Sequence, residues 1–125
     1  MVKSLVSIFI CLALIAGGAI YEHAFIDRQF GEFSAVVETL YDKTREEVAT
    51  RQDVEAVQQN WRKKKDVLHA FIPHNDIKEV ELWLGETLSL VSYGKYEDAL
   101  SKMDVLKELC RQIPKTYSLS FSNIF

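Results

Sequence analysis

The residues best suited to chemistry are the histidines His23, His69 and His74 and the carboxylates near the last of them. Two histidines on one helix share a metal ion when they lie four residues apart, but His69 and His74 lie five apart with Pro73 between them. We therefore expect His74 at a helix boundary and His69 on a helix flank, both in structural roles. A site that combines His74 with Glu81, about two turns into the next helix, is the alternative.

A run of four basic residues comprises Arg62, Lys63, Lys64 and Lys65. Four consecutive helical residues point in more than one direction, so this run cannot form one narrow basic stripe. We expect a solvated helix face with pairs such as Arg62 and Asp66. The alternative is a broad cationic face that meets anionic headgroups or a cell-wall polymer.

No motif in the sequence predicts a catalytic centre. The carboxylates stand singly among basic residues, whereas catalytic pairs share a desolvated pocket. Nucleophile elbows, phosphate-binding glycine loops and zinc-ligand spacings are absent. Cys110 lies on an apolar helical stripe, which is typical of a core residue. We predict a non-enzymatic protein with no catalytic, metal or cofactor-binding residues.

The elements that would position these residues are helices, because apolar residues recur at steps of three and four through the chain. Thr50 with Asp53 and Asp76 with Glu79 are typical of helix starts, Asn75 being an equally good cap for the latter. The expected helices run over about 27–48, from about Thr50 to Pro73, from about Asp76 to Gly94 and from about Tyr96 to Gln112, with Pro114 closing the last. We expect the apolar tail 115–125 to pack back onto these helices.

The first 21 residues predict a membrane segment, because Ser4 to Tyr21 contains eighteen positions without a charge. An eighteen-residue helix is about 27 Å long, near the lower limit for crossing a bilayer core of roughly 30 Å. Apolar residues resume at Ala24 with no intervening proline, which favours an uncleaved anchor that continues into the next helix. A cleaved signal peptide is the alternative, since small residues at 16–19 suit a peptidase.

The distribution of charge predicts orientation and excludes one class of partner. Lys3 precedes the span, while Glu22 and Asp27 follow it, so residues 22–125 are expected outside the cytoplasm. The chain has 15 Lys and Arg and 18 Asp and Glu, and Lys3 is the only one of these before residue 22. The domain therefore has an acidic excess, which argues against nucleic-acid binding.

The predicted fold is all-α, with an N-terminal transmembrane helix over 1–21 and an antiparallel bundle of about four amphipathic helices over 22–125. With two Cys residues, one in the membrane segment and one near the end of the domain, we expect no intramolecular disulfide. Helix packing must then supply nearly all of the stability.

Several features occur together along the chain: a single N-terminal span, Trp61, Lys63, Lys64 and Lys65, the run from Phe71 to Asp76, Glu79, Glu81, and the closing Pro114, Leu119, Asn123, Ile124 and Phe125. In these the chain resembles an uncharacterised domain-of-unknown-function family of small, N-terminally membrane-anchored helical proteins of spore-forming Gram-positive bacteria. The resemblance implies an anchored helical domain facing away from the cytoplasm, and it supplies no activity. It also implies that the region from Trp61 to Glu81 is distinctive.

We expect a membrane-tethered scaffold or protein-interaction module at the outer face of the cytoplasmic membrane, with an envelope protein as partner. The alternative is a domain that binds a ligand or envelope polymer in the groove near His74; a hydrolase acting on the envelope is a third class. The residues expected to carry interaction or structural roles are Trp61, Lys63, Lys64, Lys65, His74, Asp76 and Glu81.

Overall fold

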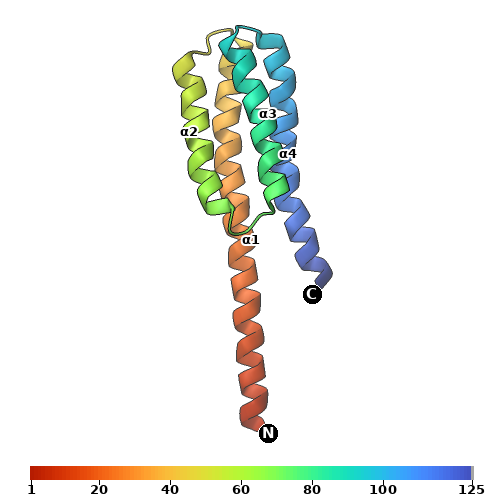
Figure 1. Cartoon of the computed structure of the whole chain (residues 1–125). Helices are drawn as coiled ribbons and strands as arrows, with labels where there is room; N and C mark the ends of the chain where they lie inside the picture. The colour runs from red at the N-terminus through yellow and green to blue at the C-terminus, as the bar shows by residue number, and fades with distance from the viewer. Residues whose placement is uncertain (125) are drawn as a thin grey trace.

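The computed structural model describes the backbone of residues 1–124 and the side chains of residues 1–116. Four helices make up this part of the chain: α1 (Val2–Arg45), α2 (Arg51–Leu68), α3 (His74–Ser92) and α4 (Tyr96–Ile124). Helix α1 packs against α2 and α4, and α3 packs against the same two helices. Figure 1 shows consecutive helices running in opposite directions, with the N-terminal half of α1 projecting from one end of the bundle. The all-α prediction is confirmed.

Helix α1 is one unbroken helix of 44 residues, and it joins the apolar segment to the bundle without a turn. Its buried residues begin at Ile26, whereas the apolar window before them has a mean hydropathy of 2.3 and none of it is buried. By length and composition this helix could cross a membrane, and an N-terminal signal sequence would meet the same criteria.

Helix α1 ends three residues earlier than expected, at a turn in which Glu47 has a positive φ of 59°. The amides of Glu47 and Val48 donate to the carbonyls of Thr44 and Lys43 at 3.0 and 2.9 Å. This pattern is a Schellman motif, which usually has glycine where Glu47 stands.

The predicted cap of the second helix is confirmed. The Thr50 hydroxyl accepts a hydrogen bond from the Asp53 amide, and the Asp53 carboxylate accepts one from the Thr50 amide at 2.8 Å. These reciprocal bonds satisfy two amides that the helix itself leaves without partners.

The turn between α2 and α3 differs from the prediction at both of its ends. Helix α2 stops at Leu68, before Pro73, and α3 begins at His74. The extended Pro73 is the residue before the first helical turn, and its carbonyl accepts the amides of Asp76 and Ile77 at 3.1 and 3.3 Å. The predicted cap at Asn75 or Asp76 is therefore wrong, because both residues already lie in the first turn of the helix that begins after Pro73.

The predicted end of the fourth helix is also wrong. Gly94, with a φ of 75°, ends the preceding helix as expected, but α4 then continues through Pro114 to Ile124. Pro114 cannot donate a backbone hydrogen bond, yet it is buried, and the Thr116 hydroxyl donates to the Gln112 carbonyl at 3.0 Å one turn further on. The expected packing of the tail's side chains falls beyond residue 116, outside the described side chains.

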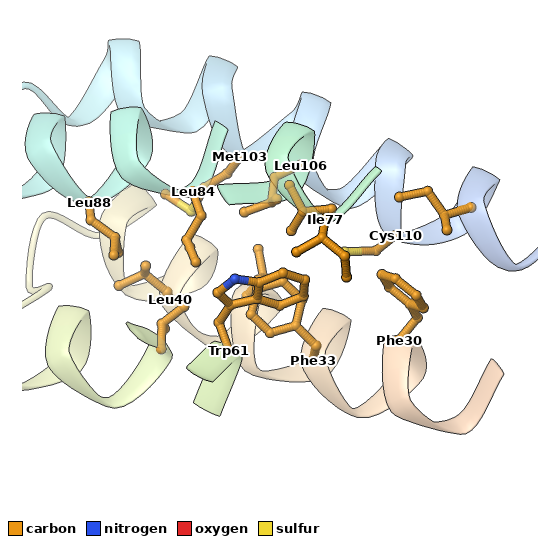
Figure 2. Packing of buried hydrophobic residues seen from close by; sticks show 14 of the residues in the cluster. Phe30, Phe33, Leu40, Trp61, Ile77, Leu84, Leu88, Met103, Leu106 and Cys110 are labelled. Carbon is orange, nitrogen blue, oxygen red and sulfur yellow. The ribbon is translucent and has the colours of Figure 1, made fainter. Parts of the chain in front are cut away.

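The core lies where the apolar stripes of the four helices meet, as Figure 2 shows. All four predicted stripes are buried, and Phe33, Val37, Val80, Ala99, Met103 and Leu106 have no exposed surface. Cys110 lies beside Phe30 and Ile77 in this core (Figure 2). In the turn after α2, Ile72 is buried and Phe71 is exposed.

Each pair of helices that pack together is also joined by an ion pair on the surface of the bundle. The pair of Lys107 with Glu38 joins α4 to α1 at 3.2 Å, and that of Lys102 with Glu86 joins α4 to α3 at 3.3 Å. The Lys107 ammonium also lies 3.7 Å from the centre of the Tyr41 ring. Such pairs on a bundle surface contribute little individually, but they favour one pairing of helices over others.

Candidate functional site: the Trp61 cluster

Trp61 is the centre of the region that the sequence singled out. Its side chain projects from α2, is 3% exposed, and lies with its ring centre 5.0 Å from that of Phe33 on α1. The indole N–H donates to the Glu81 carboxylate on α3 at 3.3 Å. Figure 2 shows the indole in the core with Phe33, Ile77 and Leu84. A single side chain thus links three helices.

In the basic run beside Trp61, Lys64 and Lys65 bind carboxylates on two different neighbouring helices. The Lys64 ammonium binds Glu32 and donates to the Gln29 amide oxygen at 2.9 Å, both on α1. The Lys65 ammonium lies 2.6 Å from the Glu81 carboxylate on α3. Arg62 and Lys63 are exposed.

This division changes the interpretation of the run. Lys64 lies between Trp61 and Leu68 on the buried side of α2, and its side chain is only 12% exposed. Its stem lies along the protein while its charge meets a carboxylate at the edge. With Lys64 and Lys65 paired to opposite sides, the run contributes two exposed cations rather than one broad cationic face.

The carboxylates of the cluster are held in their ionised form. The hydrogen bond and charge of Lys64 lower the pKa of Glu32. Partial burial acts to raise the pKa of Glu81, but the hydrogen bonds from Lys65 and Trp61 outweigh it and lower that pKa. A general acid needs a raised pKa, so neither carboxyl group has the electrostatic setting of one.

A small cleft opens between α2 and α3 beside this cluster. Its volume is about 210 Å³, and its lining includes Trp61, Arg62, Lys65, Glu81 and Gly85. Sites for small-molecule ligands generally occupy about 300–1,000 Å³. This cleft is therefore below the usual range, although it combines an aromatic edge with both signs of charge.

A larger and more open groove of about 610 Å³ runs along the outer face of α3. It is lined by Leu82, Gly85, Ser89 and Leu90, with Glu86 and Lys102 on its border. Leu82 is 60% exposed. We refer to this surface, Leu82 to Leu90 with Lys102, as the α3 groove.

His69 and His74 lie against each other at the α2–α3 turn. Their rings stack at a centroid distance of 6.0 Å. Glu81 instead binds Trp61 and Lys65, so the two members of the proposed His74 and Glu81 site have different partners. Asp76 lies in the first turn of α3. No group of three His, Cys, Asp or Glu residues suited to a metal ion occurs within the described part of the chain.

Sequence reasoning missed the partners of the cluster. Gln29 and Glu32 lie beside the apolar stripe of α1. The sequence shows them only as polar residues that could pair with the basic run. Sequence reasoning also missed Gly85, whose missing side chain leaves open space on α3. A glycine inside a helical pattern was the available sign.

Comparison with protein families gives one match, to a domain of unknown function, DUF4363, over residues 29–124. The chain belongs to the DUF4363 family. The DUF4363 match covers α2, α3 and α4 completely, together with most of the bundle portion of α1. The match begins after the apolar segment of α1, so it gives no information about a membrane anchor. No curated protein and no solved structure matches the chain.

Proposed function

We propose that this DUF4363 protein is a membrane-tethered, non-enzymatic scaffold or protein-interaction module whose antiparallel helical bundle lies at the outer face of the cytoplasmic membrane. The observation that carries the proposal is the continuity of α1, in which an unburied apolar half runs directly into a closed, packed half. An apolar helix surface of this size is costly in water and stable in lipid. Because the two halves form one helix, the bundle is held close to the anchor.

The orientation rests on charge. Lys3 and the amino terminus precede the apolar segment, and Glu22 and Asp27 follow it. The positive-inside rule then directs the bundle away from the cytoplasm. A role in the envelope of spore-forming Gram-positive bacteria is part of the proposal through the resemblance alone.

The non-enzymatic character is supported by the chemistry of the titratable groups. The carboxyl groups of Glu32, Asp53, Glu81 and Glu108 all have lowered pKa values, chiefly through nearby hydrogen-bond donors. Burial raises the pKa of the Cys110 thiol to about 12, which leaves almost no thiolate at neutral pH. These groups suit structural roles.

The α3 groove is the surface that we expect to meet an envelope protein. It offers an exposed apolar side chain at Leu82 and a partly buried one at Leu90, with the charges of Glu86 and Lys102 beside them, which is the pattern of a protein-binding patch. A partner segment with apolar side chains would cover this patch.

The test is site-specific photocrosslinking in cells with a photoreactive amino acid at position 82, and at the exposed position 63 on α2 as the matched control. We expect a discrete adduct with an envelope protein from position 82 and a weaker one or none from position 63. Equal, diffuse labelling from both positions would contradict the proposed interaction surface. Mass spectrometry of the mature chain tests the tether separately, because cleavage after Ala19 would remove the anchor.

Binding of a small ligand or envelope polymer is the second candidate, favoured by the cleft beside Trp61, Lys65 and Glu81. Arg62 lines that cleft and not the α3 groove, so an Arg62→Ala substitution would remove one charge from the cleft and leave the groove unchanged. A ligand that copurifies with the wild-type chain and is lost from this variant would favour the second candidate over the first.

A further inference from the structure

An aromatic cluster lies at the end of the bundle from which the apolar half of α1 emerges. The rings of Tyr21 and Phe25 stack at a centroid distance of 6.4 Å, and the Phe25 ring lies 5.5 Å from that of Phe71 in the α2–α3 turn. The Arg28 guanidinium lies 5.8 Å from the centre of the Phe25 ring. Phe71 remains 37% exposed and Tyr21 71% exposed. The cluster is thus a partly uncovered aromatic surface with a cation beside it.

The position of this cluster along α1 is fixed by helix geometry. Tyr21 is the last residue of the charge-free segment, and Phe25 lies four residues further on, an axial rise of about 6 Å. The headgroup layer on each side of a bilayer is about 5 to 7 Å thick. If residues 4–21 span the hydrocarbon core, Phe25 and the Phe71 that touches it lie at the level of the headgroups.

The C-terminal end of α4 also lies at this end of the bundle (Figure 1). Lys115 and Asp27 line one cleft between α4 and α1, so the two helices are at a common level there. Beyond Lys115 the sequence carries no charged residue. The α4 backbone continues as a helix to Ile124 on the side of the bundle from which α1 projects, as Figure 1 shows. Nine helical residues from Thr116 to Ile124 rise about 13 Å.

We propose that this end of the bundle rests in the lipid headgroup layer, with Phe71, Phe25 and Tyr21 as interfacial aromatic residues and the last turns of α4 beside them. Tyr21 suits this depth because its ring is apolar and its hydroxyl is polar, and the rings of Phe25 and Phe71 can bury apolar surface at the boundary of headgroups and acyl chains. The domain then touches the bilayer at three places, namely α1, the α2–α3 turn and the end of α4. The inference rests on the proposed tether, and it adds that the bundle does not stand away from the membrane.

The test is fluorescence quenching of the full-length protein in vesicles of phosphatidylcholine and phosphatidylglycerol that carry bromine on their acyl chains near the surface. Phe71→Trp places a reporter in the turn, and Ala70→Trp is a second, exposed reporter there should the first variant fail to fold. Val48→Trp is the matched control, because Val48 is 55% exposed and lies at the opposite end of the bundle. The emission of Trp61 and Trp83 in the wild-type chain is subtracted.

We expect the added emission at position 71 or 70 to be largely lost in brominated vesicles and that at position 48 to be retained. If both turn reporters keep their emission as position 48 does, while the protein still floats with the vesicles, the headgroup contact is refuted and the tether stands. If the protein separates from the vesicles on flotation, the tether itself fails.

Discussion

The Lys65 ammonium and the Glu81 carboxylate lie 2.6 Å apart across α2 and α3, and the same carboxylate accepts the Trp61 indole N–H at 3.3 Å. One carboxylate therefore satisfies a core donor on one side and a surface cation on the other. The arrangement keeps a tryptophan's polar atom satisfied in an apolar interior, where an unpaired donor would be costly.

Trp61→Phe tests that relationship. The substitution keeps a ring against Phe33 but removes the N–H, and we expect it to lower the free energy of unfolding by about 1 kcal/mol. Trp61→Ala also removes the ring and should cost about 3–5 kcal/mol. The measurement is urea unfolding of the detergent-solubilised chain followed by circular dichroism.

Trp83→Phe is the control for that experiment, because Trp83 is only partly buried and lies under the Lys102 ammonium at 5.0 Å. It should have a smaller effect than Trp61→Phe. An unfolding curve for Trp61→Phe that superimposes on the wild type would mean that the bond to Glu81 contributes nothing to stability.

Asp53 makes stability depend on acid pH. Its hydrogen bonds, first from Lys43 and then from the Thr50 amide, lower its pKa from 3.8 to about 2. Because the folded pKa is below the unfolded one, the contribution of Asp53 is present above about pH 4 and is lost as the pH falls towards about 2. Asp53→Ala should destabilise the chain by about 1 kcal/mol at pH 7, through loss of the cap.

The measurement is unfolding of wild type and Asp53→Ala at several pH values between 7 and about 2. The gap between the two proteins should narrow through this acid range. Asp66→Ala on the same helix gives the baseline for removing an exposed carboxylate. A gap that stays constant down to the lowest pH would be inconsistent with the lowered pKa.

Glu47→Gly should raise stability. Glu47 occupies the left-handed position of the α1 terminus with a φ of 59°, which costs an L-residue about 1 kcal/mol relative to glycine. We expect a gain of about 0.5–1 kcal/mol and a higher melting temperature. The reciprocal change, Gly94→Ala at a φ of 75°, should destabilise by a similar amount. A loss of stability in Glu47→Gly would show that its side chain, and not its backbone, matters at this turn.

Cys110 should be inert to alkylation in the folded state. It is 4% exposed, and burial raises its pKa to about 12. In a Cys11→Ala background, iodoacetamide at pH 8 should leave Cys110 unmodified until urea unfolds the bundle, as read by mass spectrometry. Rapid labelling without denaturant would mean that the packing around Phe30 and Ile77 opens readily.

The apolar stripes, the Thr50 cap and the Gly94 terminus were predictable because each depends on residues close together in the sequence. The start of α3 and the passage of α4 through Pro114 were not, since proline allows more than one outcome and the surrounding packing decides. A glutamate in a left-handed conformation likewise has no local signal.

The candidate site was predictable only in part. Trp61, Lys65 and Glu81 were selected from the sequence, and they meet in the structure. The separation of Lys64 towards α1 and Lys65 towards α3 depends on which helices flank α2, and a charge run cannot specify that. The contact of Phe25 with Phe71 joins residues from two helices in the same way.

Helix α1 passes from its apolar half into the core without a break. The direction in which each residue of the apolar half faces is therefore fixed relative to the bundle. Each residue turns the helix by about 100°, so one residue inserted between Tyr21 and Ile26 would rotate the surface of residues 4–21 by that angle relative to the bundle. Deleting seven residues would shorten the helix by about 10 Å with little rotation. The four residues between Tyr21 and Ile26, with their neighbours, thus set both the rotation of the domain about the anchor and its distance from it.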